Sequence, residues 1–237
     1  MDGLDPARIA EFAVWFIVFL FSLTLHEAAH ALAARQGGDD TAYLGGQVTL
    51  NPAPHIRREP FGTLLMPIIS WFFAGWMMGW ASTPYDPRWA RRYPRRQAVM
   101  SAAGPAANLL LSAVAFLVIA LLLRAGMFQA PQLGLSISHL AEPASRFGPD
   151  SMLHPAAMAL SIALSLNLLL FVFNLFPLPP LDGSGVVSGL FPDSLGRVIE
   201  TLSGNPMMSL LVLLVVSRVV GFVYAPVLGF AVALLPY

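Results

Sequence analysis

Long apolar runs alternate with short polar stretches along the chain, and this alternation predicts its architecture. Crossing the hydrocarbon core of a bilayer takes about 20 predominantly apolar residues in a helix. Four runs reach that length, at residues 10–34, 98–124, 152–176 and 206–235. The pattern therefore predicts an all-α, polytopic membrane protein with about four transmembrane helices.

A fifth apolar run, residues 61–81, is interrupted by glycine and proline. It could cross the membrane, or it could enter the membrane and return to the same side. The positive-inside rule bears on this choice, because loops rich in arginine stay on the cytoplasmic side. The arginines concerned are Arg35, Arg57, Arg58, Arg88, Arg91, Arg92, Arg95 and Arg96. They all lie on one side only if residues 61–81 form a re-entrant segment, so the rule favours that interpretation.

Residues 41–52 separate the first apolar run from the re-entrant segment. Tyr43, Val48 and Thr49 have high β propensity, and turn-forming Gly45-Gly46 and Asn51-Pro52 punctuate them. Such residues between turn-forming dipeptides are typical of a hairpin. The sequence therefore predicts a short β-hairpin after the first transmembrane helix.

The composition agrees with a membrane protein. Hydrophobic residues make up 57% of the 237 residues and charged residues only 11%, against roughly 25% charged residues in soluble domains. The formal net charge is zero, which gives no indication of nucleic-acid binding, and membrane lipid is the expected surrounding. This chain contains no cysteine, so thiolate metal sites and a cysteine nucleophile are excluded. Histidine, aspartate and glutamate remain as strong metal ligands.

The first apolar run contains His26-Glu27-Ala28-Ala29-His30, the HExxH pattern. Positions four apart share one face of a helix, so both imidazoles can bind one metal ion. Glu27 lies beside them and can act as a base on a metal-activated water, which is the arrangement of zinc hydrolases. Because the pattern lies in a predicted transmembrane helix, we expect this chemistry to take place within the membrane.

A catalytic zinc usually has three protein ligands, so a third ligand is expected elsewhere in the chain. Asp182 is the best candidate, because it follows the third transmembrane run and an acid in apolar surroundings is costly unless it is paired or metal-bound. It can reach His26 and His30 only if the ends of both helices meet on one side of the membrane. A re-entrant segment gives that topology, so metal geometry and arginine placement agree.

Three motifs together resemble the site-2 protease family, the intramembrane zinc metalloproteases of the M50 type. They are His26-Glu27-Ala28-Ala29-His30, Gly104-Pro105-Ala106-Ala107-Asn108, and the NxxPxPxxDG element from Asn174 to Gly183. Their order and spacing also match, over about residues 9–190. The segment Leu50-Asn51-Pro52 with His55 resembles the short bacterial branch of this family, which has no PDZ or CBS domain.

The resemblance implies one zinc ion held by His26, His30 and Asp182, with Glu27 as the general base. It also implies that Asn108 lies near the metal, where it could hydrogen-bond the substrate backbone or an oxyanion. The substrate would be a transmembrane helix of another protein, unwound locally and held by β-augmentation along an exposed strand. The residues expected to bind it are Gly46, Gln47, Val48, Thr49, Leu50 and Asn174.

These expectations describe one membrane-embedded peptidase domain, residues 1–237, with a catalytic core at about 9–190 and a C-terminal transmembrane helix at about 206–235. The expected location is a bacterial cytoplasmic (inner) membrane, with the active site toward the cytoplasm. Two alternatives stay open, a pseudoprotease that binds membrane proteins without cleaving them and a metal transporter. The presence of Glu27 argues against the first, and the scarcity of further His, Asp and Glu along the other helices argues against the second. The oligomeric state stays undetermined.

Overall fold

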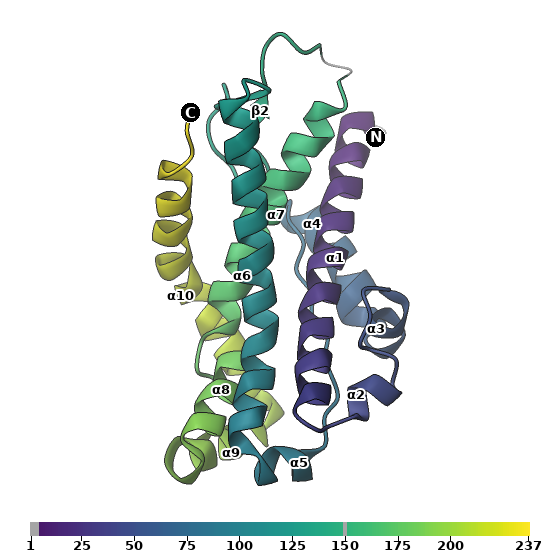
Figure 1. Ribbon diagram of the computed structural model, residues 1–237, viewed down its shortest axis with the longest axis vertical. Helices are drawn as coiled ribbons and strands as arrows, with labels where there is room; N and C mark the ends of the chain where they lie inside the picture. Colours follow the sequence, from purple (N-terminus) through teal and green to yellow (C-terminus); the bar gives the residue numbers. More distant parts are fainter. Residues whose placement is uncertain (1–4, 149–150) are drawn as a thin grey trace.

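In the computed structural model, which describes residues 5–148 and 151–237, four long helices lie side by side and form the body of the protein (Figure 1). They are α1 (Pro6–Gln36), α6 (Pro94–Arg124), α7 (Leu153–Asn174) and α10 (Pro206–Ala233). Each is long and apolar enough to cross a membrane. The predicted all-α membrane protein is therefore confirmed, and its spans lie close to the predicted positions.

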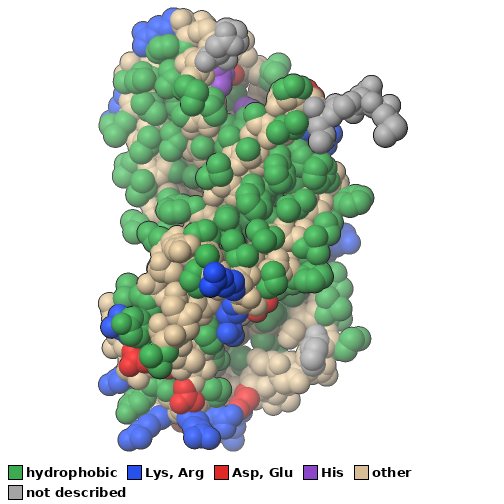
Figure 2. Space-filling model, turned by 90° about the vertical axis from the view of Figure 1, so that its right-hand side faces the viewer, with side chains coloured by type: hydrophobic (Ala, Val, Ile, Leu, Met, Phe, Trp, Pro, Cys, Tyr) green, Lys and Arg blue, Asp and Glu red, His purple; other side chains and the backbone are tan. Residues whose placement is uncertain are grey.

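Apolar side chains also cover the outer surfaces of these helices. Leu121 on α6 is 64% exposed, and Phe222 on α10 is 82% exposed. Figure 2 shows hydrophobic side chains over the upper and middle parts of one face, with a few basic side chains among them, and a concentration of charged side chains at the lower end. A helix that is apolar all round requires either a large protein core or lipid around it. This surface is that of an integral membrane protein.

Helix α7 packs against α1, α6 and α10. Its buried Ile162 lies in one apolar cluster with Trp15 of α1, and its Leu164 lies in another with Ile119 of α6. The Ser112 hydroxyl of α6 also donates to the Leu164 carbonyl at 3.0 Å. These contacts fix α1, α6 and α7 relative to one another, and the candidate site is built from α1, α6 and the segment that follows α7.

The segment between α1 and α6 leaves the end of α1, folds up beside it and returns. It contains α2 (Thr41–Leu44), α3 (Ala53–Arg58), a π-helical turn η1 (Phe61–Leu65), α4 (Met66–Ala74) and α5 (Pro87–Arg92). The chain reverses at Gly75, which has a positive φ of 75° that favours glycine. Residues 76–86, which we call the returning arm, then run back to α5 without further helix or strand.

Contacts between its two arms show that the fifth apolar run is re-entrant. The Trp80 N–H donates to the Gly62 carbonyl at 3.1 Å, and the Ser82 hydroxyl donates to a Glu59 carboxylate oxygen at 2.8 Å. A Cβ on Gly62 or Gly79 would overlap the backbone of the opposite arm, so only glycine fits where the arms meet. The two ends of the run are therefore adjacent, as the arginine placement favours.

The carboxylate of Asp39 fixes the lower end of the returning arm. It accepts hydrogen bonds from the Thr41 N–H (3.0 Å), the Thr41 hydroxyl (2.5 Å) and the Asp86 N–H (2.9 Å). Burial alone would raise the pKa of Asp39, but these hydrogen bonds outweigh burial and hold the pKa below its ordinary value. This contact ties the end of α1 to the start of α5, so the arm is held beside α1.

The β-hairpin predicted for residues 41–52 does not form there. Thr41–Leu44 form helix α2 instead, and Gly46 follows with a positive φ of 72°. Farther on, the side chains of Thr49 and Asn51 accept hydrogen bonds from backbone N–H groups two residues ahead. Local bonds of this kind compete with a β ladder, which explains why the β propensity of the segment is not expressed.

A short antiparallel pair does exist elsewhere, in the loop between α6 and α7. It joins β1 (Phe128–Gln129) to β2 (Glu142–Pro143). The prediction is therefore right about the kind of element and wrong about its place in the chain.

Three more short helices lie at the same end of the molecule as the C-terminus of α1 (Figure 1). They are α8 (Asp182–Leu190), a π-helical turn η2 (Pro192–Gly196) and α9 (Arg197–Ser203). Arginines of α5, the start of α6 and η2–α9 gather at this end, which we call the arginine-rich end. The loop between α6 and α7 lies at the opposite end.

The re-entrant topology predicts the side from which single cysteines are labelled. In this cysteine-free chain, we expect Arg57→Cys and Arg91→Cys to react with a membrane-impermeant thiol reagent from the same side of a sealed vesicle. Ser136→Cys, in the loop between α6 and α7, is the control and should react from the other side. Labelling of positions 57 and 91 from opposite sides would contradict the re-entrant arrangement.

Candidate metal centre

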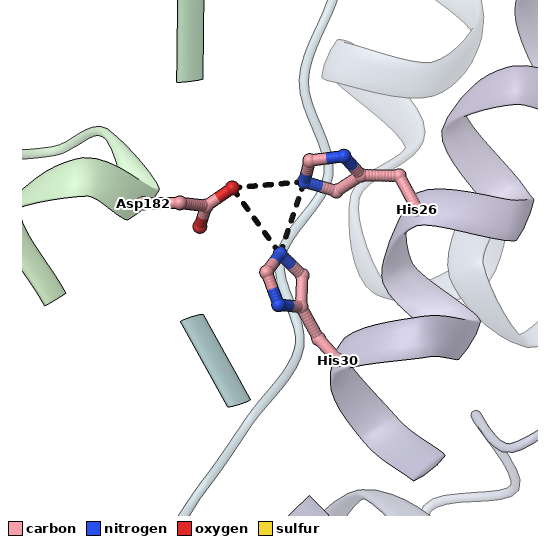
Figure 3. A group of neighbouring side chains, drawn as sticks. All are labelled: His26, His30 and Asp182. Carbon is pink, nitrogen blue, oxygen red and sulfur yellow. Dashed lines mark hydrogen bonds and ion pairs between the residues drawn. The ribbon is translucent and has the colours of Figure 1, made fainter. Parts of the chain in front are cut away.

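Two histidines of α1 and the aspartate that begins α8 converge at one point (Figure 3). His26 and His30 are four residues apart, so their imidazoles share a face of α1. Their Nε2 atoms are 3.0 Å apart. Asp182 Oδ2 lies 3.0 Å from His26 Nε2 and 3.3 Å from His30 Nε2. The group has the composition and spacing of a metal site.

The second ring nitrogen of each histidine fixes its tautomer. His30 Nδ1 lies 2.7 Å from the Met100 carbonyl, which can only accept, so this nitrogen carries the hydrogen. His26 Nδ1 lies 2.5 Å from Asn108 Oδ1, which is also an acceptor. Both Nε2 atoms therefore direct lone pairs toward Asp182, as neutral histidine ligands must.

Three electron-rich atoms at this spacing repel one another unless a cation lies among them. Asp182 Oδ2 is buried and has no hydrogen-bond donor in the described part of the chain. A tetrahedral zinc with bonds of about 2.0–2.1 Å places its ligand atoms ~3.3 Å apart, close to the observed spacing. The donor set of two imidazoles and one carboxylate also suits zinc and leaves a fourth position for water. The residues therefore fit a zinc ion.

One face of α6 supports the histidines. Met100, Gly104 and Asn108 are spaced four residues apart and so form a stripe along this helix. The carbonyl of Met100 holds one ring and the amide of Asn108 holds the other. A Cβ on Gly104, between them, would lie 2.6 Å from His26 Nε2 and closer still to His30 Nε2. Glycine thus leaves the space in which the metal would lie.

Glu27 lies beside this group and lines a cavity of about 510 Å³ together with His30 and Asp182. The hydroxyl of Thr83, on the returning arm, donates to Glu27 Oε2 at 2.7 Å. The cavity extends to Arg91 of α5 and Glu200 of α9, which form an ion pair at 3.3 Å. It therefore leads from the candidate site toward the arginine-rich end.

The structure places Asn108 beside a candidate metal ligand, as expected, but not on the cavity. Asn108 is 0% exposed and does not line the cavity. Its amide oxygen faces His26, and its amide nitrogen donates to Asn167 Oδ1 at 2.8 Å. Because both ends of the amide are engaged inside the protein, the expected contact with substrate or an oxyanion is replaced by a contact with a candidate ligand.

The residues expected to bind substrate do not line the cavity either. None of the set Gly46, Gln47, Val48, Thr49, Leu50 and Asn174 lines it. Gln47 is buried against Ser82, and the Asn174 side chain donates to a carbonyl of its own helix. The lining comes instead from the returning arm, through Ala81, Ser82, Thr83 and Tyr85.

Three residues of the site escape a motif search. Met100 acts through its backbone carbonyl, although its spacing from Gly104 and Asn108 is visible in the sequence. Thr83 reaches Glu27 only because the re-entrant segment returns. Asn167 is an amide in the middle of an apolar transmembrane run, and that is the signal that could have singled it out.

Comparison with known proteins finds the same family that the sequence motifs resemble. A family model described as Peptidase family M50 matches residues 14–217. The chain is 35% identical over 177 residues to "Putative zinc metalloprotease YwhC" of Bacillus subtilis, over 74% of this chain and 68% of that protein. It is 30% identical over 112 residues to "Putative zinc metalloprotease Rip2" of Mycolicibacterium smegmatis, over 47% of this chain and 42% of that protein. No solved structure gives a significant match.

The position of Gly104 predicts the effect of adding one methyl group. We expect Gly104→Ala to abolish tight zinc binding, because the new Cβ would occupy the space between the histidine nitrogens. Elemental analysis of the purified protein should show bound zinc falling from about one ion per chain to background. Gly221→Ala on α10 is a matched control, since a Cβ there meets nothing within 4 Å. Full zinc occupancy in Gly104→Ala would contradict this placement of the metal.

Proposed function

Because this chain belongs to peptidase family M50 and is a zinc metalloprotease, we propose that it hydrolyses peptide bonds within membrane-spanning segments of other proteins. One observation carries the proposal. His26, Glu27 and His30 lie inside α1, a helix that is long and apolar enough to cross a membrane, and each is at most 5% exposed. The substrate best suited to such a position is a segment that already lies in the membrane.

We assign the zinc ion to His26, His30 and Asp182. When bound there, zinc would polarise the scissile carbonyl and lower the pKa of a water molecule toward about 7. The three residues supply two neutral imidazoles and one carboxylate, and they leave one position free for water, as catalytic zinc sites do. His26 and His30 are each 5% exposed, whereas the Asp182 side chain is 23% exposed and lines the cavity.

Glu27 would be the general base. Its carboxylate lines the same cavity as His30 and Asp182, so it can take a proton from water and deliver it to the leaving amine. The Thr83 hydroxyl holds Glu27 Oε2 and leaves Oε1 for the proton. Thr83 would thus act as a positioning residue that restricts the rotation of the base.

The returning arm is the segment best placed to hold an unwound substrate. Ala81, Ser82, Thr83 and Tyr85 line the cavity, and none of their N–H groups donates to an acceptor in the described part of the chain. A peptide that pairs with free backbone groups gains hydrogen bonds, as in β-augmentation. This assignment replaces residues 46–50, which do not line the cavity.

We further propose that the cavity opens toward the cytoplasm of a bacterial cell. Its far lining includes Arg91, and the arginine-rich end around it is cytoplasmic by the positive-inside rule. That rule and the shared topology of residues 57 and 91 support this orientation. Water would then reach the site from the cytoplasmic side, through the polar cavity and not through lipid.

The two alternatives receive less support. A role limited to binding does not require Glu27, which is present and lines the cavity together with two of the candidate ligands. A transport path needs several polar sites along the membrane. Within residues 5–148 and 151–237, His26, His30 and Asp182 form the one group of His, Asp and Glu side chains that could hold a metal ion.

The proposed base predicts a variant that binds zinc without cleaving. We expect Glu27→Gln to keep about one zinc ion per chain and to cleave at least about 100-fold more slowly, because a general base contributes about 10²–10⁴-fold. Both proteins would be reconstituted with a panel of membrane proteins that have a single span, and the fragments would be identified by mass spectrometry. Cleavage only outside the spans, or equal cleavage by Glu27→Gln, would overturn the proposal.

The contact of Thr83 with Glu27 predicts a graded effect on turnover. Thr83→Val keeps the shape of the side chain but removes the donor, and a hydrogen bond to a charged group is worth about 1.5–3 kcal/mol. We therefore expect kcat to fall about 10–100-fold with zinc content unchanged. Thr83→Ser keeps the hydroxyl and should retain most of the activity. A kcat for Thr83→Val equal to that of Thr83→Ser would show that the hydroxyl does not position Glu27.

A further inference from the structure

A series of buried hydrogen bonds runs from His26 through α6 and α7 and back to α1. His26 Nδ1 donates to Asn108 Oδ1 (2.5 Å), and Asn108 Nδ2 donates to Asn167 Oδ1 (2.8 Å). Asn167 Nδ2 donates to the Ser22 hydroxyl (2.9 Å), which donates in turn to the Val18 carbonyl (2.7 Å). Asn108, Asn167 and Ser22 are all 0% exposed. The series therefore joins three membrane-spanning helices behind one candidate zinc ligand.

Backbone carbonyls set the direction of this series, because they can only accept hydrogen bonds. Asn167 Nδ2 also donates to the Ala163 carbonyl at 2.8 Å, so both of its hydrogens are engaged away from Asn108. The amide oxygen of Asn167 must then face Asn108. Asn108 must in turn present its nitrogen to Asn167 and its oxygen to His26. This arrangement leaves His26 one tautomer, with hydrogen on Nδ1 and a lone pair on Nε2.

We propose that Asn167 is a positioning residue that sets the tautomer of His26 through Asn108 and thereby makes His26 a zinc ligand. The inference rests on the proposed ligand set and extends it to Asn167 and Ser22, which no motif assigns. Without a fixed acceptor at Nδ1, the hydrogen can move to Nε2 and block the metal. Outer partners of this kind orient metal-binding histidines and raise their affinity.

Burial within the membrane-spanning helices restricts the side-chain amides of this series to one orientation. An amide group that is buried without a partner loses its hydration and destabilises the folded protein, so each member of the series is held in the one orientation that satisfies all of them. If Asn167 turned over, its oxygen would face the Ala163 carbonyl. If Asn108 turned over, its nitrogen would face His26 and force the hydrogen of that ring onto Nε2. The orientation of two amides thus decides whether His26 can bind zinc.

The test compares zinc affinities of the full chain in detergent, with a fluorescent chelator as competitor. Asn167→Leu keeps the approximate shape of the side chain but leaves the Asn108 amide free to turn over. We expect the dissociation constant for zinc to rise about 10–100-fold, as for other outer partners of metal ligands. Ser22→Ala removes only one of the two acceptors of the Asn167 amide, so the rise should be smaller.

Ser112→Ala is the matched control. Ser112 lies one turn beyond Asn108 on α6, is buried, and also donates across to α7, but it has no link to His26. It should lower the melting temperature by about 2–4 °C, as expected for the loss of one buried hydrogen bond, and leave the zinc affinity unchanged. An equal loss of zinc affinity in Ser112→Ala and Asn167→Leu would show that both substitutions act only through helix packing and would overturn the inference.

A second measurement does not depend on whether Asn167→Leu folds. Nitrogen-15 NMR of the metal-free wild-type protein, labelled at histidine, distinguishes the two neutral tautomers, and His26→Gln identifies the signal. We expect the hydrogen of His26 on Nδ1. A hydrogen on Nε2 in the folded, metal-free protein would overturn the inference even if Asn167→Leu failed to fold.

The same samples separate this inference from the proposed function. If the wild-type protein binds no zinc, or if His26→Ala binds zinc as tightly as the wild type, the proposed ligand set itself is wrong. If the wild-type protein binds zinc through His26 and Asn167→Leu binds it with the same affinity, the ligand set stands and only the proposed role of Asn167 is wrong.

Discussion

Mutual repulsion among three electron-rich atoms is the constraint on which this structure depends. Two imidazole lone pairs and a carboxylate oxygen lie within 3.3 Å of one another in the interior of an apolar helix bundle. Such a group is stable only around a cation, and it keeps its geometry only if each member is held from behind. The Met100 carbonyl, the Asn108 amide and the missing Cβ of Gly104 supply that support from a single face of α6.

The same constraint explains the topology. Asp182 begins α8, directly after the turn that follows α7, so it reaches α1 only if α1 and α7 end on the same side. The re-entrant segment makes this possible, because it enters and returns instead of crossing. Its returning arm then places Thr83 against Glu27 and lines the cavity. One topological choice thus brings together the third ligand, the partner of the base and the segment proposed to bind substrate.

Most of this architecture follows from the sequence, because lipid imposes simple rules. A span must be long and apolar, so α1, α6, α7 and α10 are visible as apolar runs. Two histidines four residues apart must share a helix face, and an unpaired acid after an apolar span needs a cation. For these reasons His26, His30 and Asp182 could be selected before the structure was known, and the structure brings all three together.

The remaining features depend on tertiary contacts that the sequence pattern does not record. The β propensity of residues 41–52 is overridden by side-chain caps and a glycine turn, so the predicted substrate strand is absent there. Asn108 matches its motif, yet its function depends on what faces each end of its amide. Asn167 contacts Asn108 and Ser22, which are separated from it by 59 and 145 positions along the chain. The role of a residue that acts through a second residue in this way can be recognised only from a structure that shows both residues together.

The most direct test of the account is X-ray absorption at the zinc edge on the purified, folded protein. The account predicts one zinc with two imidazole nitrogens at about 2.0–2.1 Å and light oxygen ligands in the remaining positions. Replacing Asp182 by alanine should remove one oxygen ligand or the metal itself. A folded protein without zinc, or a zinc site whose spectrum is the same in wild type and Asp182→Ala, would contradict the account.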